Sequence, residues 1–456
     1  MNSKTHMNRR YVYISAAVAT IGGLLFGYDT AVISGTIIFL QKQFALSPMM
    51  EGWAVSCVLI GCVAGVSFAG SFSDKWGRKK GMLLAACLFS LSAIGCALSG
   101  QFYQFVIFRF IGGIGVGIAS MLSPMYIAEI SPAPIRGRLT AMNQLAIITG
   151  MLVTYIVNWA LVDIGPNNWR WMFAAEAIPS SLFLVALFFV PESPRWLAKS
   201  GREQESLSIL TKIGGAEFAI NESQNIKLTL DHKKVLLKQL FTKEMRLPLL
   251  IGSILAIFTQ VTGINTILYY APKIFIMAGI ETASSAYANA IMIGVVNVFF
   301  TVLAVMTVDQ IGRRRILIIA VCGMGLFLML MGLAFMFDTF PSGFIVFFVF
   351  FFFAFFMYGL GSGFWVLVAE IYPNQIRGRA LSVVTIVLWS ATFLVAQTFP
   401  LLIAHMGEAG TFWIYACMCI LAFGFIYKYI PETKGKTLEE IEAMWTGKKE
   451  KGLTHV

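Results

Sequence analysis

The chain has 456 residues, of which 58% are hydrophobic and only 12% are charged, and its net charge is +11. Soluble domains carry about 25% charged residues, so this composition excludes an ordinary soluble globular protein. The mean hydropathy of +0.77 supports the same conclusion. The seven cysteines include no CxxC pair and lie in apolar segments, so we expect neither a disulfide framework nor a metal site.

Apolar runs of about 18 residues or more predict membrane-spanning helices. We expect twelve of them, over residues 11–33, 52–73, 81–99, 103–128, 139–162, 170–190, 247–270, 286–309, 316–337, 343–371, 380–404 and 410–430. The long polar stretch in the middle predicts a linker with short helices such as 203–213. The prediction is an all-α membrane protein with six-helix bundles over 1–190 and 247–430, a cytoplasmic linker over 191–246 and a cytoplasmic tail over 431–456.

The first apolar segment contains a single charge, Asp29. A carboxylate near the middle of a membrane costs roughly 3 kcal/mol or more, so it is expected to face a polar cavity or a partner. Two interpretations stay open from the residues alone. Asp29 is either an acid satisfied structurally by an arginine of a neighbouring helix or a protonatable site on a transport pathway.

The basic residues predict the orientation of the chain. With the N-terminus in the cytoplasm, 30 of the 34 Lys and Arg residues fall on the inside, and only Lys42, Arg170 and Lys273 fall outside. Arg109 lies within a segment. This asymmetry satisfies the positive-inside rule, so the positive charge is a topology signal and no nucleic-acid partner is expected.

Three motifs of the first half recur in the second half, 235 to 241 positions later. The run from Asp74 to Lys80 returns from Asp309 to Arg315, Glu129 with Arg136 returns as Glu370 with Arg377, and Pro191-Glu192 returns as Pro431-Glu432. Two homologous halves follow from this repetition. The repeats fall at the cytoplasmic ends of helices, where acids can pair with arginines. We expect gating salt bridges among Asp74, Arg78, Glu129, Arg136, Glu192, Arg195, Asp309, Arg313, Glu370, Arg377 and Glu432; the alternative is that these charges only set topology and solubility.

Nothing in the sequence indicates an enzyme. The glycine run Gly112–Gly117 follows no strand and lies inside an apolar segment, where small residues favour close helix packing rather than phosphate binding. The four histidines are scattered, without a nucleophile or metal constellation. We expect no cofactor.

Several motifs, in this order along nearly the whole chain, resemble those of the sugar porters of the major facilitator superfamily. They are Gly70–Lys80, Pro191–Arg195, Gln260–Asn265, Arg377–Arg379 and Pro431–Gly435. Among these porters, the stretches Gly22–Gly35, Ile111–Glu129, Phe173–Glu176 and Pro431–Glu440 are most similar to bacterial xylose–proton symporters. The resemblance implies a carrier that alternates access around a sugar site near the midplane of the membrane.

A sugar needs amides and hydroxyls for its hydroxyl groups and an aromatic platform for its C–H faces. The residues that match sugar-contacting positions of the family are Phe26, Gln144, Gln260, Asn265, Tyr269, Asn297, Trp365 and Trp389. Two departures leave the identity of the sugar open. Thr259 replaces the first glutamine of a common pair, and Leu388 replaces an amide before Trp389.

The resemblance also implies a proton site. Asp29 and Arg109 stand at positions that pair in the symporters, and Glu176 matches an acid proposed to modulate that site. Burial raises the pKa of a carboxyl group and a nearby arginine lowers it, so a change of partner can load and release a proton. For Glu176 a purely structural role is an equal alternative.

Three functional hypotheses remain. The favoured one is a proton-coupled symporter of a monosaccharide, such as xylose or a hexose, in a bacterial cytoplasmic membrane, acting as a monomer with both termini inside. The second is a passive sugar or polyol facilitator of the same fold. The third is a non-transporting receptor, which the 26 residues after Ile430 make improbable because such sensors tend to have long signalling tails.

Overall fold

The computed structural model describes residues 7–230, 242–337, 340–372, 376–435 and 440. Within these ranges the secondary structure is helical, and eleven helical segments are long and apolar enough to cross a membrane. The last of them, α16 (Arg377–Tyr429), has 53 residues and leaves helical geometry at Gly407, where φ is 69°. It therefore contains two of the twelve predicted spans, 380–404 and 410–430, joined end to end. The prediction of an all-α membrane protein is confirmed.

The chain divides into two compact units. Unit 1 comprises Met1–Leu46 and Trp53–Lys234, and unit 2 comprises Ser47–Gly52 and Val235–Val456. The helices of unit 1 are α1 (Arg9–Phe44), α2 (Pro48–Trp76, after its first turn), α3 (Arg78–Leu98), α4 (Phe102–Ile130), α5 (Ala133–Leu161), α6 (Asn168–Ala174), α7 (Ala177–Phe188), α8 (Pro194–Lys199) and α9 (Glu203–Leu230). The linker helix predicted over 203–213 is present as the first part of α9.

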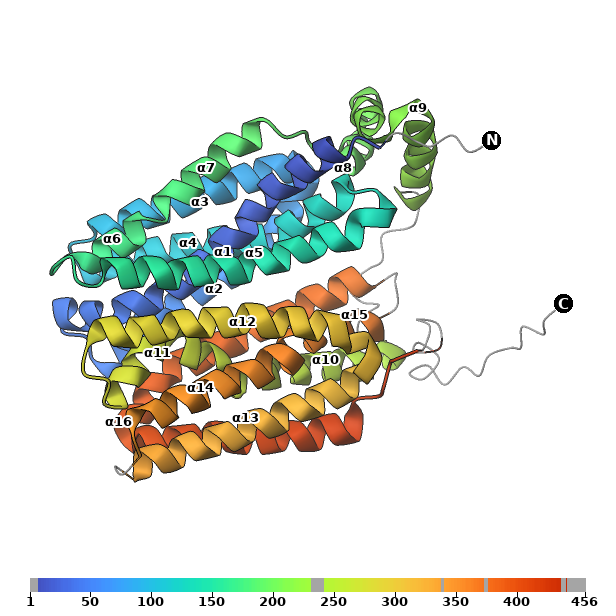
Figure 1. Cartoon of the computed structure of the whole chain (residues 1–456). Coiled ribbons are helices and arrows are strands. Elements are labelled where there is room, and N and C mark those ends of the chain that lie inside the picture. The colour runs from blue at the N-terminus through green and yellow to red at the C-terminus, as the bar shows by residue number, and fades with distance from the viewer. Residues whose placement is uncertain (1–6, 231–241, 338–339, 373–375, 436–439, 441–456) are drawn as a thin grey trace. The chain divides into compact units, whose positions relative to one another are not determined.

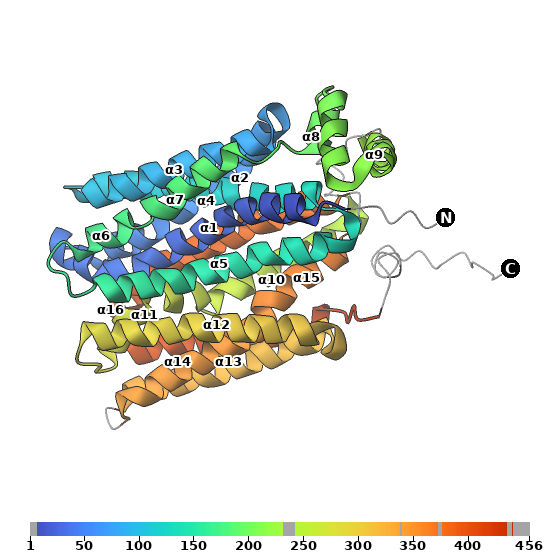
Figure 2. The ribbon, with the colours of Figure 1, turned by 45° about the horizontal axis from the view of Figure 1, so that its top comes forward.

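Helix α1 packs along α5, and α3 packs along α4 (Figures 1 and 2). Small residues permit the first of these contacts. A Cβ atom added at Gly27 would lie 1.9 Å from the carbonyl oxygen of Ile147, and one added at Gly150 would lie 2.1 Å from that of Leu24. Since the two backbones touch at these points, α1 is held against α5 at the level of Asp29.

The predicted sixth span, 170–190, is present over Asn168–Phe188, with an irregular turn inside it. It is divided into α6 and α7 at Ala175 and Glu176. At this point the backbone hydrogen bonds change from i→i−4 to i→i−3 spacing. The N–H of Glu176 donates to the carbonyl of Phe173, and that of Ile178 donates to the carbonyl of Ala175. This i→i−3 pattern is a short 3₁₀ turn, which places Glu176 between the two helices.

Unit 2 contains α10 (Lys243–Val261), α11 (Ile264–Met277), α12 (Ala283–Ile311), α13 (Arg313–Met336), α14 (Ser342–Phe356), the π-helical turn η2 (Met357–Gly361), α15 (Ser362–Ile371) and α16. Helix α16 packs against α10 and α13 (Figure 1). Two predicted spans are again interrupted. The span 247–270 breaks at Gly263, whose φ of 89° suits glycine, and the span 343–371 contains η2.

The first turn of α2 belongs to unit 2 although the rest of the helix belongs to unit 1. Within unit 2, Lys273 Nζ donates to Glu51 Oε1 at 2.5 Å, and the side chain of Glu51 is buried. Gln397 Nε2 donates to the carbonyl of Met49 at 3.0 Å. An acid in the first turn of a helix is also favoured by the helix dipole.

Candidate functional site

Unit 1 contains a buried cluster of three charged side chains. Asp29 comes from α1, Arg109 from α4, and Glu176 from the break between α6 and α7, and each is at most 1% exposed. Arg109 Nη1 donates to Asp29 Oδ1, so the ion pair expected from the sequence is present. The guanidinium group also lies 5.6 Å from the ring centre of Phe173, a cation–π contact.

This cluster has more hydrogen-bonding capacity than its described contacts use. Five of its buried atoms have no hydrogen-bond partner in the described part of the chain: Asp29 Oδ2, Arg109 Nε and Nη2, and both carboxylate oxygens of Glu176. Buried polar atoms are nearly always paired, so such a concentration of unpaired atoms needs an explanation. Two carboxylates and one guanidinium carry a net charge of −1 when both acids are ionised. A single bound proton would neutralise the cluster and would supply a hydrogen-bond donor.

Unit 2 contains a hydrogen-bonded amide group at the break between α10 and α11. Gln260 Oε1 accepts from Asn265 Nδ2 at 2.6 Å, and Gln260 Nε2 donates to Thr259 Oγ1 at 2.9 Å. From α16, Thr392 Oγ1 donates to Gln260 Oε1 at 3.0 Å. Asn265 is half-buried, whereas Gln260 is only 5% exposed. The glycine break therefore brings two of the predicted sugar-contacting amides together.

The remaining predicted sugar contacts lie in both units. In unit 1, Phe26 is half-buried on α1 and Gln144 is exposed on α5. In unit 2, Tyr269 and Trp389 are buried, and Trp365 is 41% exposed beside Phe364. Asn297 is fully buried on α12, and neither atom of its amide has a described partner.

Thr392 was not among the residues predicted from the sequence. Threonine is common in apolar helices, where its hydroxyl usually bonds to a carbonyl of the preceding turn, and Thr392 also contacts the carbonyl of Leu388 at 2.8 Å. One feature of the sequence could have indicated Thr392. Thr392 follows Leu388 by four residues, so both lie on the same face of α16.

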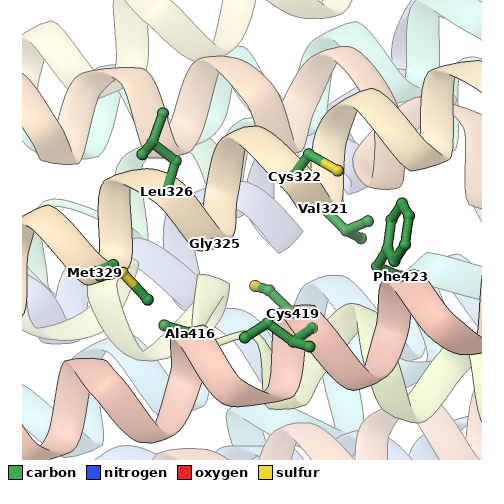
Figure 3. Close-up of a pocket in the computed structure, with 9 residues that line it drawn as sticks. Val321, Cys322, Gly325, Leu326, Met329, Ala416, Cys419 and Phe423 are labelled. Atoms are coloured by element: carbon green, nitrogen blue, oxygen red, sulfur yellow. The ribbon is translucent and has the colours of Figure 1, made fainter.

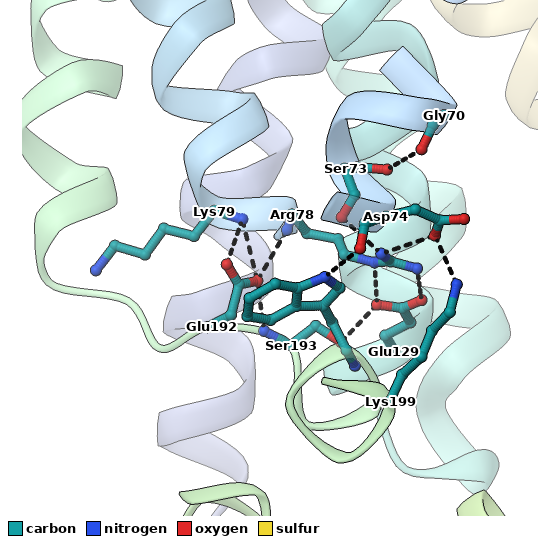
Figure 4. A network of polar contacts seen from close by, with 10 residues as sticks. Gly70, Ser73, Asp74, Arg78, Lys79, Glu129, Glu192, Ser193 and Lys199 are labelled. Atoms are coloured by element: carbon teal, nitrogen blue, oxygen red, sulfur yellow. Dashed lines mark hydrogen bonds and ion pairs between the residues drawn. The ribbon is translucent and has the colours of Figure 1, made fainter. Parts of the chain in front are cut away.

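The first set of predicted gating charges forms one network (Figure 4). Arg78 binds Glu129 through two parallel contacts, Nε to Oε2 at 2.9 Å and Nη2 to Oε1 at 3.0 Å. Glu192 Oε1 accepts from the backbone N–H groups of Arg78 and Lys79 at 3.0 and 3.1 Å. Burial raises the pKa of Glu192, and these backbone donors act in the opposite direction. Asp74 is more exposed and pairs with Lys199 at 2.9 Å.

The sequence repeat places the same chemistry in unit 2. Arg313 Nη2 binds Glu370 Oε1 at 2.8 Å, and the backbone N–H of Arg313 donates to Glu432 Oε1 at 2.9 Å. The hydroxyl of Thr433 donates to Glu370 Oε2 at 2.6 Å, as that of Ser193 does to Glu129 Oε2 at 2.5 Å. The side chain of Asp309 lies outside the described part of the chain.

Three predicted gating arginines have no ion pair among the described contacts. Arg136 donates to the carbonyl of Ser131 at 3.2 Å, and Arg377 donates to that of Tyr372 at 3.2 and 3.3 Å. Each of these two arginines binds the carbonyl of the residue five positions earlier, at the end of the preceding helix, where the last carbonyls lack helical partners. Arg195 is exposed on α8.

A pocket of about 280 Å³ lies between α13 and α16 (Figure 3). Its lining is almost entirely apolar: Val321, Cys322, Gly325, Leu326, Met329, Ala416, Cys419, Ile420 and Phe423. Such a surface offers no set of donors and acceptors for hydroxyl groups, so the pocket does not suit a sugar. Among the described residues, no group of three or more His, Cys, Asp or Glu side chains could hold a metal ion.

Helical breaks at polar residues, a buried charge cluster and two repeated halves define a membrane transporter built from internal repeats. The family profile "Sugar (and other) transporter" matches residues 15–445, and the chain belongs to this family. It is 42% identical to the D-xylose-proton symporter of Escherichia coli K12, over 97% of both chains. It is 43% identical to the arabinose-proton symporter of Bacillus subtilis, over 95% of both chains.

Solved structures lead to the same family. The inward-open conformation of the xylose transporter XylE from E. coli matches with a TM-score of 0.85 and 42% identity, covering 95% of this chain and all of that one. The proton:xylose symporter XylE bound to 6-bromo-6-deoxy-D-glucose matches with a TM-score of 0.76 over 96% of this chain and all of that one. The major facilitator fold and the resemblance to sugar porters are thereby confirmed, and the protein is a transporter rather than an enzyme.

Proposed function

We propose that this protein imports a monosaccharide in symport with protons by alternating access, with a pentose as the first candidate substrate. The observation that carries the proposal is the buried cluster of Asp29, Arg109 and Glu176, whose atoms keep unused hydrogen-bonding capacity. Relatives named as xylose-proton and arabinose-proton symporters, at 42% and 43% identity, support both the proton and the pentose.

In this mechanism Asp29 is the site that binds and releases the proton. An ionised Asp29 is held by Arg109, whereas a protonated Asp29 no longer needs the positive charge. The guanidinium group is then available to Glu176, which is buried in the same cluster. The position of the Arg109 side chain thus depends on whether Asp29 is protonated. A shift of this side chain would change the contact between α1, which carries Asp29, and α4, which carries Arg109. One proton that moves down about 100 mV supplies roughly 2.3 kcal/mol, enough for about fifty-fold accumulation of sugar.

The sugar would be bound by amides that both donate and accept and by aromatic rings that cover its C–H faces. We assign the amide role to Gln144, Gln260, Asn265 and Asn297, and the aromatic role to Phe26, Tyr269, Trp365 and Trp389. Thr259 and Leu388 reduce the number of amides in unit 2. With fewer amides in unit 2, we expect the part of the sugar that faces unit 2 to carry fewer hydroxyl groups than a hexose would.

The two charge networks are proposed to gate the inner side of the carrier. In each network an arginine at the start of a helix binds a glutamate at the end of another helix. Breaking and remaking such pairs would change which helix ends are held together. We further propose that the protein lies in the bacterial cytoplasmic membrane with both termini inside, and that it works as a monomer.

Reconstitution into proteoliposomes tests the proposal. Pentoses, hexoses and polyols are added one at a time, and labelled uptake is recorded together with external pH in weak buffer. Symport predicts that the transported sugar makes the outside more alkaline. Saturable uptake without a pH change would instead show a passive facilitator, and binding without uptake would show a receptor.

A further inference from the structure

The apolar pocket between α13 and α16 is open on one side (Figure 3). Leu326, Met329 and Ile420 line it, yet their side chains are 55%, 47% and 60% exposed. Both helices belong to segments that are long and apolar enough to cross a membrane. Apolar side chains that are exposed along such a segment face lipid rather than water. The pocket is therefore accessible to an acyl chain of the bilayer.

A pair of stacked rings connects this pocket to the end of the two helices. Phe423 lines the pocket, and its ring centre lies 6.0 Å from that of Tyr427, one turn later, with the planes at 18°. The guanidinium group of Arg314, at the start of α13, lies 5.3 Å from the ring centre of Tyr427, a cation–π contact. Arg314 Nη2 also donates to the carbonyl of Tyr427. Contacts thus lead without interruption from the apolar pocket to a positive charge.

Arg314 and Lys428 bring two positive charges to this end of the pocket. Lys428 is exposed, and its Nζ lies 5.2 Å from the ring centre of Tyr429. In the described part of the chain neither cation forms an ion pair, and Arg314 Nε is buried without a hydrogen-bond partner. Tyrosines beside basic side chains are typical of the boundary between membrane and water. The donors of Arg314 are therefore placed at the level of lipid headgroups.

The acids at the same end of unit 2 have donors of their own. Glu370 binds Arg313 at 2.8 Å and accepts from the hydroxyl of Thr433 at 2.6 Å. Glu432 Oε1 accepts from the backbone N–H groups of Arg313 and Lys434 at 2.9 and 3.1 Å. Since neither carboxylate is paired with Arg314 or with Lys428 in these contacts, both cations remain available to an anion from outside the chain.

We propose that this pocket and its basic end form a binding site for one anionic phospholipid. The planar donors of Arg314 bind the phosphate, and Lys428 adds positive charge. One acyl chain lies in the pocket against Phe423. Arg314 and Val321, the first lining residue of α13, are seven positions apart, about 10 Å along a helix, which leaves room for the glycerol between phosphate and chain. Basic pockets between membrane helices commonly bind such headgroups, and this site is independent of the transported substrate.

Native mass spectrometry of the complete chain in detergent measures the binding. Palmitoyl-oleoyl phosphatidylglycerol and the phosphatidylcholine with the same acyl chains are titrated separately. One phosphatidylglycerol should bind several-fold more tightly than phosphatidylcholine, because only phosphatidylglycerol carries a net negative charge. Equal affinities for the two lipids would overturn the assignment of an anionic headgroup.

Variants of the basic end test whether the charge acts locally. Arg314→Gln should weaken the binding of phosphatidylglycerol about fivefold, which is the contribution of one basic side chain near an anionic lipid surface. Arg138→Gln is the matched control, because it removes the same charge at an exposed position near the start of α5 in unit 1. Equal losses in the two variants would show diffuse attraction by the net charge of the protein, and the proposed site would be wrong.

The apolar part of the site is tested in the same way. Cys322→Phe places a ring in the pocket and should weaken the binding of both lipids several-fold, whereas Ile319→Phe, at an exposed position of α13 outside the lining, should not. Unchanged binding by Cys322→Phe would remove the acyl chain from the pocket. Thermal unfolding of each variant without added lipid confirms that a changed affinity does not reflect a misfolded protein.

Crosslinking locates the lipid on the wild-type chain. Phosphatidylglycerol with a photoreactive diazirine in one acyl chain is reconstituted with the protein, and the crosslinked peptides are identified by mass spectrometry. The crosslinks should concentrate on residues 321–329 and 416–423. Crosslinks spread evenly over the membrane-spanning helices would show ordinary bilayer lipid and would overturn the site.

Discussion

Asp29 has two properties that bear on its role. It is fully buried with a charged partner, and its Oδ2 atom has no hydrogen-bond partner among the described residues. A structural ion pair is expected to satisfy both oxygens, because an unsatisfied buried atom costs about 1–3 kcal/mol. The Oδ2 atom of this acid is thus a position at which a proton can bind beside the ion pair with Arg109.

Replacing Asp29 tests its role directly. Asp29→Asn retains the size of the side chain but cannot lose a proton at neutral pH, so uphill accumulation should fall to a ratio of one while sugar exchange remains measurable. The measurement is labelled-sugar uptake into proteoliposomes with and without a proton gradient. Asp163→Asn, at an exposed acid of the same unit, is the control and should accumulate normally. Full accumulation by Asp29→Asn would rule out Asp29 as the coupling site.

Gly27 provides a test of packing at the same level of α1. Gly27→Ala would place a Cβ atom 1.9 Å from the carbonyl oxygen of Ile147, so α1 and α5 would have to separate. Overpacking of this kind costs about 1–3 kcal/mol, and we expect a lower unfolding temperature in detergent. Gly137→Ala on α5 meets nothing within 4 Å and should leave the unfolding temperature unchanged or raise it slightly. Equal behaviour of the two variants would show that the close approach is not needed.

At this scale the sequence predicted the charged residues better than the polar ones. Asp29 and Arg109 stand out because a charge in an apolar run is costly whatever surrounds it. Thr392 does not, since a threonine in an apolar helix can bond to its own backbone. Its second contact, with Gln260, depends on a crossing of α10 and α16 that no local pattern encodes.

The interruptions in the helices are the main feature at the scale of elements. Glu176 lies at the break between α6 and α7, and Gln260 and Asn265 flank the break at Gly263. At Gly263 the backbone leaves helical geometry, and in transporters such irregular backbone lies where it is buried in protein or lines a cavity. The apolar runs predicted the spans but not these breaks, because hydropathy is the same on both sides of a break.

The two charge networks differ in exposure, which leads to a prediction. The side chains of Arg78 and Glu129 are 8% and 9% exposed, whereas those of Arg313 and Glu370 are 13% and 21% exposed. Breaking a buried ion pair costs about 3 kcal/mol or more, and solvent screening reduces this cost. Glu129→Gln should therefore lower the unfolding temperature more than Glu370→Gln does.

Glu205→Gln is the control for both variants, because its ion pair with Arg202 is about half exposed on each side. It should have almost no effect, as is usual for surface pairs. Raising the salt concentration should narrow the difference between the wild type and Glu370→Gln more than that between the wild type and Glu129→Gln. The reverse order of the two variants would contradict the argument from burial.

At the scale of the whole molecule, duplication explains why one sequence repeat produces two similar networks. The basic residues predicted an orientation, and the repeats predicted two halves. Neither could predict that residues 47–52 would group with the second unit. Residues 47–52 contact the second unit through the buried acid Glu51, which binds Lys273 more than 200 positions later in the chain.

The coupling of sugar uptake to the proton gradient is a property of the complete carrier and can be tested on the unaltered protein. A protonophore removes the proton gradient without altering the sugar site. The accumulation ratio should then fall to one, while exchange of labelled for unlabelled sugar across the same membrane continues at an unchanged rate. The readouts are the steady-state ratio and the exchange rate in one preparation. A ratio that stays above one would require another driving ion.

The position of residues 47–52 has a consequence for dividing the gene. A cut in the linker would produce two polypeptides that match the ancestral duplication, yet the second polypeptide would lack the first turn of α2, and Lys273 would lose the acid it binds within its own unit. Co-expressed halves should therefore be more stable than the second half alone. Inheritance and side-chain pairing divide this chain at different places, because residues 47–52 precede the linker but bind Lys273 and Gln397 of the second half.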